Sequence, residues 1–198
     1  KQNLETMEAF TKDYTYPWLY FKGFFQSERF FKDVENEVRQ AFAFDLNKAN
    51  SASKDLASRI SADPNAVALH VRRGDYMDPK FYKRYGTVCG LAYFQTAVEQ
   101  ILNRVPQAHF YVFSDDIEWV RQNIRLPRIT VVDCNRGKDS WQDMMLMSMC
   151  RHNIICNSTF SWWGAWLNNH PKKIVIAPSR WLADVDMPYI LPASWIKI

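Results

Sequence analysis

Short apolar segments alternate with longer segments of helical periodicity along most of this chain, and this alternation limits its possible folds more strongly than any other feature. The apolar segments have the length of β-strands and cover residues 66–71, 109–113, 129–133, 153–156 and 173–177. Helix-like segments lie between them, at residues 91–105, 117–124, 140–150 and 160–169. Nearly continuous apolar strands separated by helices are typical of a parallel sheet that is covered on both faces. With right-handed crossovers, the sequence predicts an α/β fold with a Rossmann-like parallel sheet.

The first third of the chain lacks this alternation. It begins with a stretch rich in aromatic residues, and a helix is then predicted from Ser27, with apolar residues four positions apart at Phe30, Val34, Val38 and Phe42. A second, weaker helix follows, and the turn sequence Asp63-Pro64-Asn65 comes after it. We therefore predict that residues 1–63 form an aromatic-rich segment plus helices and that residues 64–198 form the Rossmann-like domain.

Composition excludes several classes of protein. Of 198 residues, 47% are hydrophobic and 23% are charged, which is ordinary for a domain with a packed core and excludes a mostly disordered chain. The net charge of +4 is too small for a general polyanion binder, so we expect no nucleic-acid partner. The longest apolar runs are too short to span a bilayer. The four cysteines form no Cys-x-x-Cys pair, which predicts reduced thiols in a cytoplasmic protein and no zinc site.

Polar clusters follow four of the predicted strands. They are residues 70–76 (His-Val-Arg-Arg-Gly-Asp-Tyr), 114–116 (Ser-Asp-Asp), 134–137 (Cys-Asn-Arg-Gly) and 157–164 (Asn-Ser-Thr-Phe-Ser-Trp-Trp-Gly). In open α/β sheets, ligands bind beyond the carboxyl ends of the strands. We therefore expect these clusters to meet at one edge of the sheet and to form the ligand site.

The first cluster ends a strand with two adjacent guanidinium groups, those of Arg72 and Arg73. A guanidinium stays charged and presents a planar fork that matches phosphate oxygens, so the pair predicts a diphosphate site. The alternative is that either arginine forms a structural ion pair with Asp75 or Asp116. The sequence contains no glycine-rich phosphate loop of the Walker or dinucleotide-binding type.

The second and fourth clusters allow more than one interpretation. Asp115 and Asp116 could bind a divalent metal or accept hydrogen bonds from a base or a ribose, but an Asp in this place is also a common helix N-cap. Residues 157–161 bring hydroxyl groups to the start of a helix, where an anion can bind. At least one of these hydroxyls is expected only to cap that helix.

These motifs resemble the signature of glycosyltransferase family 11, in its bacterial branch. The resemblance rests on residues 70–76, on residues 113–116 (Phe-Ser-Asp-Asp) and on residues 157–167, and it extends over residues 18–198. It implies transfer of L-fucose, with inversion, from GDP-β-L-fucose to the 2-hydroxyl of a terminal β-galactoside. It also implies two facing Rossmann-like domains (GT-B type). The Gly-rich motif with which family members begin is not found here, so the resemblance implies the C-terminal, donor-binding half, with residues 1–63 as a remnant of, or link to, the acceptor-side domain.

The resemblance also assigns roles to individual residues. Arg72 would bind the β-phosphate and assist the departure of GDP. Asp75 is a candidate catalytic base; the alternatives are that Asp75 is an ion-pair partner in the loop, or that the base belongs to the acceptor-side domain. Substrate-binding positions would be His70 and one of Asp115 and Asp116, at the guanine or its ribose. Arg73 and Asp75 would order the loop or face the sugar, and Ser158, Thr159 and Ser161 would lie beside the diphosphate. Asn157 and Phe160 would complete the substrate-binding positions. The resemblance implies no metal or other cofactor. It implies GDP-fucose and a galactoside-terminated glycan as partners, in the cytoplasm, with peripheral association at the inner face of the membrane left open.

Two other functions remain open at this point. The chain could use the same diphosphate grip for a different nucleotide sugar. It could instead be a carbohydrate-binding or adhesion module that uses its aromatic residues and the tripeptide Arg73-Gly74-Asp75. Such a module would bind glycans whether or not a nucleotide is present.

Overall fold

The fold is built on one sheet of parallel strands. The computed structural model describes residues 25–198, and the predicted aromatic-rich start of the chain lies largely outside them. The sheet has six strands in the order β3-β2-β1-β4-β5-β6. Their bounds are β1 Ala66–Val71, β2 His109–Ser114, β3 Ile129–Val132, β4 His152–Ile154, β5 Val175–Ala177 and β6 Ile196–Lys197. This is the classical doubly wound order. The chain adds β2 and β3 on one side of β1 and then crosses back to add β4, β5 and β6 on the other side, so the strand order reverses between β1 and β4. The predicted α/β, Rossmann-like fold is confirmed.

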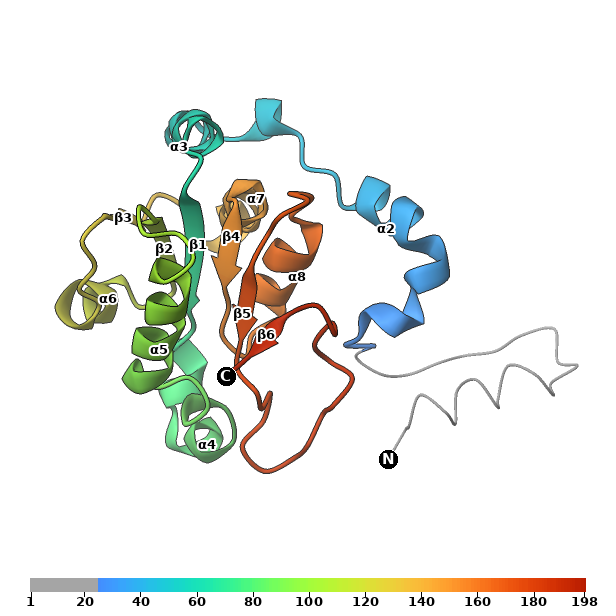
Figure 1. Ribbon diagram of the computed structural model, residues 1–198, viewed down its shortest axis with the longest axis vertical. Helices are drawn as coiled ribbons and strands as arrows, with labels where there is room; N and C mark the ends of the chain where they lie inside the picture. Colours follow the sequence, from blue (N-terminus) through green and yellow to red (C-terminus); the bar gives the residue numbers. More distant parts are fainter. Residues whose placement is uncertain (1–24) are drawn as a thin grey trace, which may run out of the picture.

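Helices cover both faces of this sheet (Figure 1). The α-helices are α2 Glu35–Ala41, α3 Ser51–Ala62, α4 Pro79–Phe81, α5 Leu91–Leu102, α6 Ile117–Asn123, α7 Trp141–Met149 and α8 Thr159–Leu167. The short helical turns are η1 Glu28–Phe30, η2 Lys32–Val34, η3 Leu46–Lys48, η4 Gly74–Met77, η5 Tyr82–Gly86 and η6 Gly137–Asp139. Figure 1 also shows a long loop between β5 and β6, and α2 at the periphery beyond α8.

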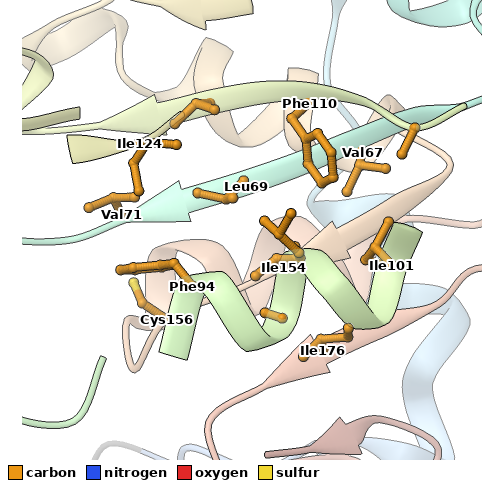
Figure 2. Packing of buried hydrophobic residues seen from close by; sticks show 14 of the residues in the cluster. Val67, Leu69, Val71, Phe94, Ile101, Phe110, Ile124, Ile154, Cys156 and Ile176 are labelled. Carbon is orange, nitrogen blue, oxygen red and sulfur yellow. The ribbon is translucent and has the colours of Figure 1, made fainter. Parts of the chain in front are cut away.

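The buried side chains of β1 alternate between the two faces, as the pleat of a strand requires. Val67, Leu69 and Val71 pack in one cluster with α5 and α6, and Figure 2 shows Phe94 and Ile101 of α5 lying against this face. Ala66 and Ala68 belong to a second cluster, with side chains of α3 and α7. The sheet therefore separates two apolar layers, and its strands are buried on both sides.

A third cluster gathers the aromatic residues around α8. Trp162 and Trp166 are buried there with Trp181 and Trp195 of the loop between β5 and β6. Phe31 stacks on Trp163 with ring centroids 5.6 Å apart. Most of the aromatic residues at the C-terminal end of the chain therefore fill a core.

The start of the described chain differs from the prediction. Instead of one helix from Ser27, the structure has η1, η2 and α2 in succession. Phe31 (φ −138°) and Val34 (φ −125°) leave helical geometry between these elements. Apolar residues do recur every four positions in this segment, as in a helix. The packing of Phe31 against the tryptophans of α8 outweighs this pattern, and the helix is interrupted. The strand β6 was not predicted, because two residues carry no periodic signal.

The predicted domain boundary near residue 63 stays a prediction. Leu56 and Ile60 of α3 pack in the same cluster as β1 and α7. Arg39 of α2 donates to the carbonyl oxygen of Trp166 at 2.9 Å, so α2 contacts the end of α8. Among residues 25–198, no helix combines the length and the apolar character needed to cross a bilayer.

Gly164 lies where α8 meets α7, and we expect substitution there to destabilise the fold. A Cβ atom at this position would lie 3.0 Å from Cβ of Met147, which is buried. Gly164→Val is therefore expected to lower the free energy of unfolding by about 1–3 kcal/mol, as overpacking in cores generally does. Denaturant unfolding measures the effect. Gly90→Ala is the matched control, because a Cβ there meets nothing within 4 Å, and an equal loss in both variants would contradict the packing argument.

Candidate active site

A polar pocket lies at the carboxyl ends of the first three strands, next to the start of α8. Its volume is about 480 Å³. It is lined by His70, Arg72, Asp75, Tyr76, Phe113, Ser114, Asp115, Ile117, Val132, Asp133, Asn135, Arg136, Gly137, Ser140, Asp143, Ser158, Thr159 and Phe160. All four polar clusters that follow strands contribute side chains to it. The expectation that these clusters converge at one sheet edge is confirmed.

Arg72 lies in the wall of this pocket between two carboxylates. Its Nη2 donates to Asp75 Oδ1 at 2.7 Å, and its Nη1 lies 3.0 Å from Asp115 Oδ2. The guanidinium carbon is 5.6 Å from the ring centroid of Tyr76. The Arg72 side chain is still 36% exposed, so these contacts hold the guanidinium in place while leaving it accessible from the pocket.

Arg73 does not line the pocket. Its Nε donates to Asp116 Oδ2 at 3.0 Å, and its guanidinium lies over the ring of Trp119, 4.2 Å from the centroid. The hypothesis that two adjacent guanidinium groups clasp one diphosphate therefore needs correction, because Arg73 does not line the pocket and forms the alternative ion pair with Asp116. The second guanidinium in the lining is that of Arg136, from the loop after β3. Successive residues at the end of a strand point to opposite sides, which separates the two side chains. The tripeptide Arg73-Gly74-Asp75 is held by ion pairs at its two ends.

Asp115 and Asp116 divide their roles. Asp116 caps α6 by accepting from the backbone N–H of Trp119 at 3.0 Å, so the capping alternative holds for one of the two carboxylates. Asp115 lines the pocket and accepts from the backbone N–H of Arg73 at 2.8 Å. Its carboxylate lies so close to Gly74 that an added Cβ there would be 2.4 Å from Oδ2. Glycine at position 74 thus allows the contact between Asp115 and Arg72.

His70 is buried at the end of β1, and its ring lies 5.6 Å from the ring of Phe160. Burial and the nearby Arg72 lower the pKa of His70 to about 3, so the imidazole is neutral at neutral pH. Its Nδ1 lies 3.2 Å from Cys156 Sγ, and burial raises the pKa of that thiol to about 12. One hydrogen bond therefore joins the neutral imidazole and the protonated thiol.

The residues at the start of α8 have different roles. Ser158, Thr159 and Phe160 line the pocket, and the side chain of Ser158 makes no capping hydrogen bond. Asn157 is buried and donates to the carbonyl oxygen of Tyr85 at 3.1 Å. Ser161 Oγ donates to the carbonyl oxygen of Ser158 at 3.1 Å. The side chains of Asn157 and Ser161 are therefore absent from the pocket lining and make internal hydrogen bonds, and the prediction that both bind substrate stays a prediction.

Sequence reasoning missed Asp143, which lines the pocket from the first turn of α7. Asn135 Nδ2 donates to Asp143 Oδ1 at 2.8 Å. Burial raises the pKa of Asp143 to about 6, and the hydrogen bond from Asn135 opposes this shift. The sequence held one signal for this residue, because it is an acidic side chain in a helix of mostly apolar residues.

A smaller aromatic pocket of about 210 Å³ shares Thr159 with the polar one. It is lined by Phe25, Gln26, Phe31, Thr159, Trp162, Trp163 and Ile190. In the part of the chain that the structure describes, no three His, Cys, Asp or Glu side chains are grouped so that they could hold a metal ion. The four cysteines are free thiols, as predicted.

His70 gives the stability of the fold a pH dependence that can be measured. Below its unfolded pKa of about 6.5, the unfolded chain takes up a proton that the buried imidazole does not, so stability falls with falling pH. Asp143, whose pKa is raised by burial, acts in the opposite direction. Between about pH 7 and pH 5, wild type is therefore expected to lose about 2 kcal/mol more than His70→Gln in denaturant unfolding. Parallel losses in the two proteins would contradict a neutral His70.

The doubly wound sheet, with its polar pocket at the carboxyl ends of the strands, places this chain among Rossmann-like domains that bind a ligand at one edge of a parallel sheet. The family model for glycosyl transferase family 11 matches residues 4–197, and the chain belongs to that family. This confirms the resemblance found in the sequence motifs.

Relatives with assigned names support the same family. The chain is 35% identical over 182 residues to an alpha-1,2-colitosyltransferase of Escherichia coli, covering 90% of the chain and 62% of that protein. It is 37% identical over 140 residues to the O-antigen biosynthesis glycosyltransferase WbnK of Escherichia coli, covering 70% and 46%. It is 30% identical over 207 residues to galactoside alpha-(1,2)-fucosyltransferase 1 of Bos taurus, covering 100% and 55%. The chain thus spans about half to three fifths of the length of these relatives.

Proposed function

We propose that this chain binds GDP-β-L-fucose and contributes to the transfer of L-fucose to the 2-hydroxyl of a terminal β-galactoside. The observation that carries the proposal is the pocket itself, which combines an accessible guanidinium with a separate, half-buried carboxylate. Arg72 suits a diphosphate, and Asp143 suits a base with N–H donors. The names of two relatives, for α-1,2 transfer of fucose and of colitose, support the linkage.

The diphosphate is proposed to bind between Arg72 and the start of α8. A guanidinium forms charge-assisted hydrogen bonds with phosphate oxygens, each worth about 1.5–3 kcal/mol. The first N–H groups of α8 add the positive end of a helix dipole. The side chain of Ser158 makes no capping bond to these N–H groups, which leaves them for a ligand.

The base is proposed to bind at Asp143. Guanine presents the N1–H and 2-amino donors on one edge, and a carboxylate accepts both. Asn135 occupies Oδ1 of Asp143, and no hydrogen bond to Oδ2 occurs among residues 25–198. Asp115 is less suited to this role, because Arg72 and the backbone N–H of Arg73 already engage its two oxygens. His70 lines the same pocket.

In the proposed reaction, the 2-hydroxyl oxygen of the acceptor attacks C1 of fucose from the face opposite GDP. A C–O bond to the acceptor forms while the bond from C1 to the β-phosphate oxygen breaks, and the acceptor proton passes to a base. Arg72 stabilises the charge that develops on the departing diphosphate. We propose that this guanidinium takes the part that a metal ion plays in other transfers, so that no metal cofactor is required. Activity that persists in excess EDTA would support this, and restoration of activity only by an added divalent ion would refute it.

Substitution of Asp75 tests its role. Its carboxylate is 56% exposed and is engaged with Arg72 at 2.7 Å. To act as the catalytic base, Asp75 would have to accept the proton of the acceptor while holding Arg72. The ion pair favours a positioning role for Asp75, in which it orients the guanidinium. Asp75→Asn would then raise the Kd for GDP, whereas loss of turnover with unchanged GDP affinity would favour the base.

One observation favours a second candidate for the transferred sugar. The alpha-1,2-colitosyltransferase of Escherichia coli shares 35% identity with the chain over 90% of its length. The transferred sugar could therefore be colitose in place of fucose, with the same nucleotide grip.

Calorimetric binding of GDP, UDP and ADP to the chain tests the nucleotide. The account predicts that GDP binds most tightly, and stronger binding of UDP would refute it. Turnover of GDP-fucose with a panel of β-galactosides then tests the transfer. Glycan binding that ignores nucleotide, with no GDP binding, would favour the carbohydrate-binding alternative.

A further inference from the structure

A chain of hydrogen bonds connects the start of α3 with the carboxylate of Asp143. It passes through Asn50, the N-cap residue of α3, and through Asn135 in the loop after β3. Asn135 is 7% exposed and Ser53 beside it is fully buried, whereas Asn50 is exposed. The network therefore runs from the surface at the start of α3 to the wall of the pocket, which Asn135 and Asp143 line. Buried polar groups are costly unless they are hydrogen-bonded, and here each link has a partner.

The first hydrogen bond of this network determines which groups donate and which accept in the others. The backbone N–H of Ser53 donates to Asn50 Oδ1 at 2.8 Å, and a backbone N–H can only donate. The amide of Asn50 therefore presents Nδ2 to Asn135, and Nδ2 donates to Asn135 Oδ1 at 2.8 Å. Asn135 must then turn its own Nδ2 toward Asp143, where it donates to Oδ1 at 2.8 Å. The hydroxyl of Ser53 contacts both ends of the Asn135 amide, at 3.1 and 2.9 Å.

We propose that Asn50 and Asn135 are positioning residues that hold Asp143 as a hydrogen-bond acceptor for the guanine base of the nucleotide sugar. The inference rests on the proposed binding of a guanine nucleotide at Asp143. Because Asp143 receives a donor at Oδ1, it is kept as an ionised carboxylate whose other oxygen can accept from N1–H and the 2-amino group. Selection of the base would then depend on α3, which lies outside the pocket lining.

Other ionisable groups surround Asp143. The ionisable groups that line the same pocket are His70, Arg72, Asp75 and Tyr76 after β1, Asp115 after β2, and Asp133 and Arg136 after β3. Cys134 in the loop after β3 also lies near Asp143. Burial is the larger influence on the pKa of Asp143 and raises it, and the Asn135 hydrogen bond is the influence that lowers it. Removing the donor that orients Asn135 should therefore move the titration of Asp143 toward neutral pH, where the protonated carboxyl would donate and cease to accept.

The test replaces Asn50 with residues that still cap α3 but cannot donate to Asn135. Asp and Ser both accept from the backbone N–H of Ser53, and neither has an amide. Asn50→Asp and Asn50→Ser are expected to bind GDP about tenfold more weakly than wild type near neutral pH. Their affinity should recover as the pH rises, and their preference for GDP over inosine diphosphate should shrink. Asn47→Asp, an exposed position on η3, is the control for the added charge.

Titration of the Asp143 carboxyl by NMR, without nucleotide, separates this inference from the proposed function. Both Asn50 variants should titrate at higher pH than wild type and Asn47→Asp. Equal titration in all four proteins would overturn the inference even if GDP binds. An upward shift of the titration in chains that do not bind GDP would instead refute the proposed nucleotide and retain the positioning of Asp143.

Discussion

Replacement of Arg72 with alanine is expected to weaken GDP binding by at least about 1.5–3 kcal/mol, the worth of one hydrogen bond to a charged group. The loss has a second cause, because Asp75 and Asp115 would face the diphosphate without their shared cation. Transfer from a GDP-sugar should fall further than binding, since the charge on the leaving phosphate grows in the transition state. Calorimetric titration and turnover with GDP-fucose measure the two effects.

Arg73→Ala is the matched control for this prediction. It also removes a guanidinium, but one that contacts Asp116 and Trp119 outside the pocket. We expect a modest change in stability and little change in the Kd for GDP. If Arg73→Ala lost as much affinity as Arg72→Ala, the assignment of a single phosphate-binding arginine would be wrong.

Replacement of Asp143 with asparagine is expected to weaken GDP binding by about 2–3 kcal/mol. A carboxylate offers two acceptor oxygens to the N1–H and 2-amino donors of guanine, whereas an amide offers one acceptor oxygen and an NH2 group that is itself a donor. Wild type should prefer GDP to inosine diphosphate, which lacks the 2-amino group, and the variant should lose most of this preference. Competition binding with the two nucleotides measures both effects.

The pH dependence of GDP binding provides an independent readout of Asp143. Burial raises the pKa of this carboxyl to about 6, and only the ionised form accepts from guanine. Wild-type affinity should therefore fall as the pH drops below about 6, while that of Asp143→Asn stays level. The raised pKa also means that the ionised form destabilises the folded state at neutral pH, so the variant should unfold no more easily than wild type. Parallel pH profiles for the two proteins would contradict the assignment.

Most of the fold could be predicted from the sequence, because a buried parallel strand leaves a strong local pattern. The segment 66–71 was predicted to the residue, and β2 and β3 differ from prediction by one residue at their ends. The start of the described chain was harder to predict, because the contacts of Phe31 with Trp163 and Trp166 come from residues more than a hundred positions away. Periodicity within one segment contains no information about such partners.

The candidate site was predicted less completely than the fold. The strand-end clusters indicated where the pocket lies, but they could not separate Arg72 from Arg73, since the difference depends on which carboxylate each side chain meets. Asn157 and Ser161 have the residue types of a binding loop and are used as internal hydrogen-bond donors. Asp143 escaped prediction because it lies inside a helix of mostly apolar residues, where Met145 and Met147 are buried, and it follows no strand.

A crystal structure of the chain with GDP tests the central claim most directly. The account predicts the β-phosphate within hydrogen-bonding distance of Arg72 and the guanine edge against Asp143. A nucleotide bound elsewhere, or one bound in this pocket while Arg72 stays engaged only with Asp75 and Asp115, would contradict it.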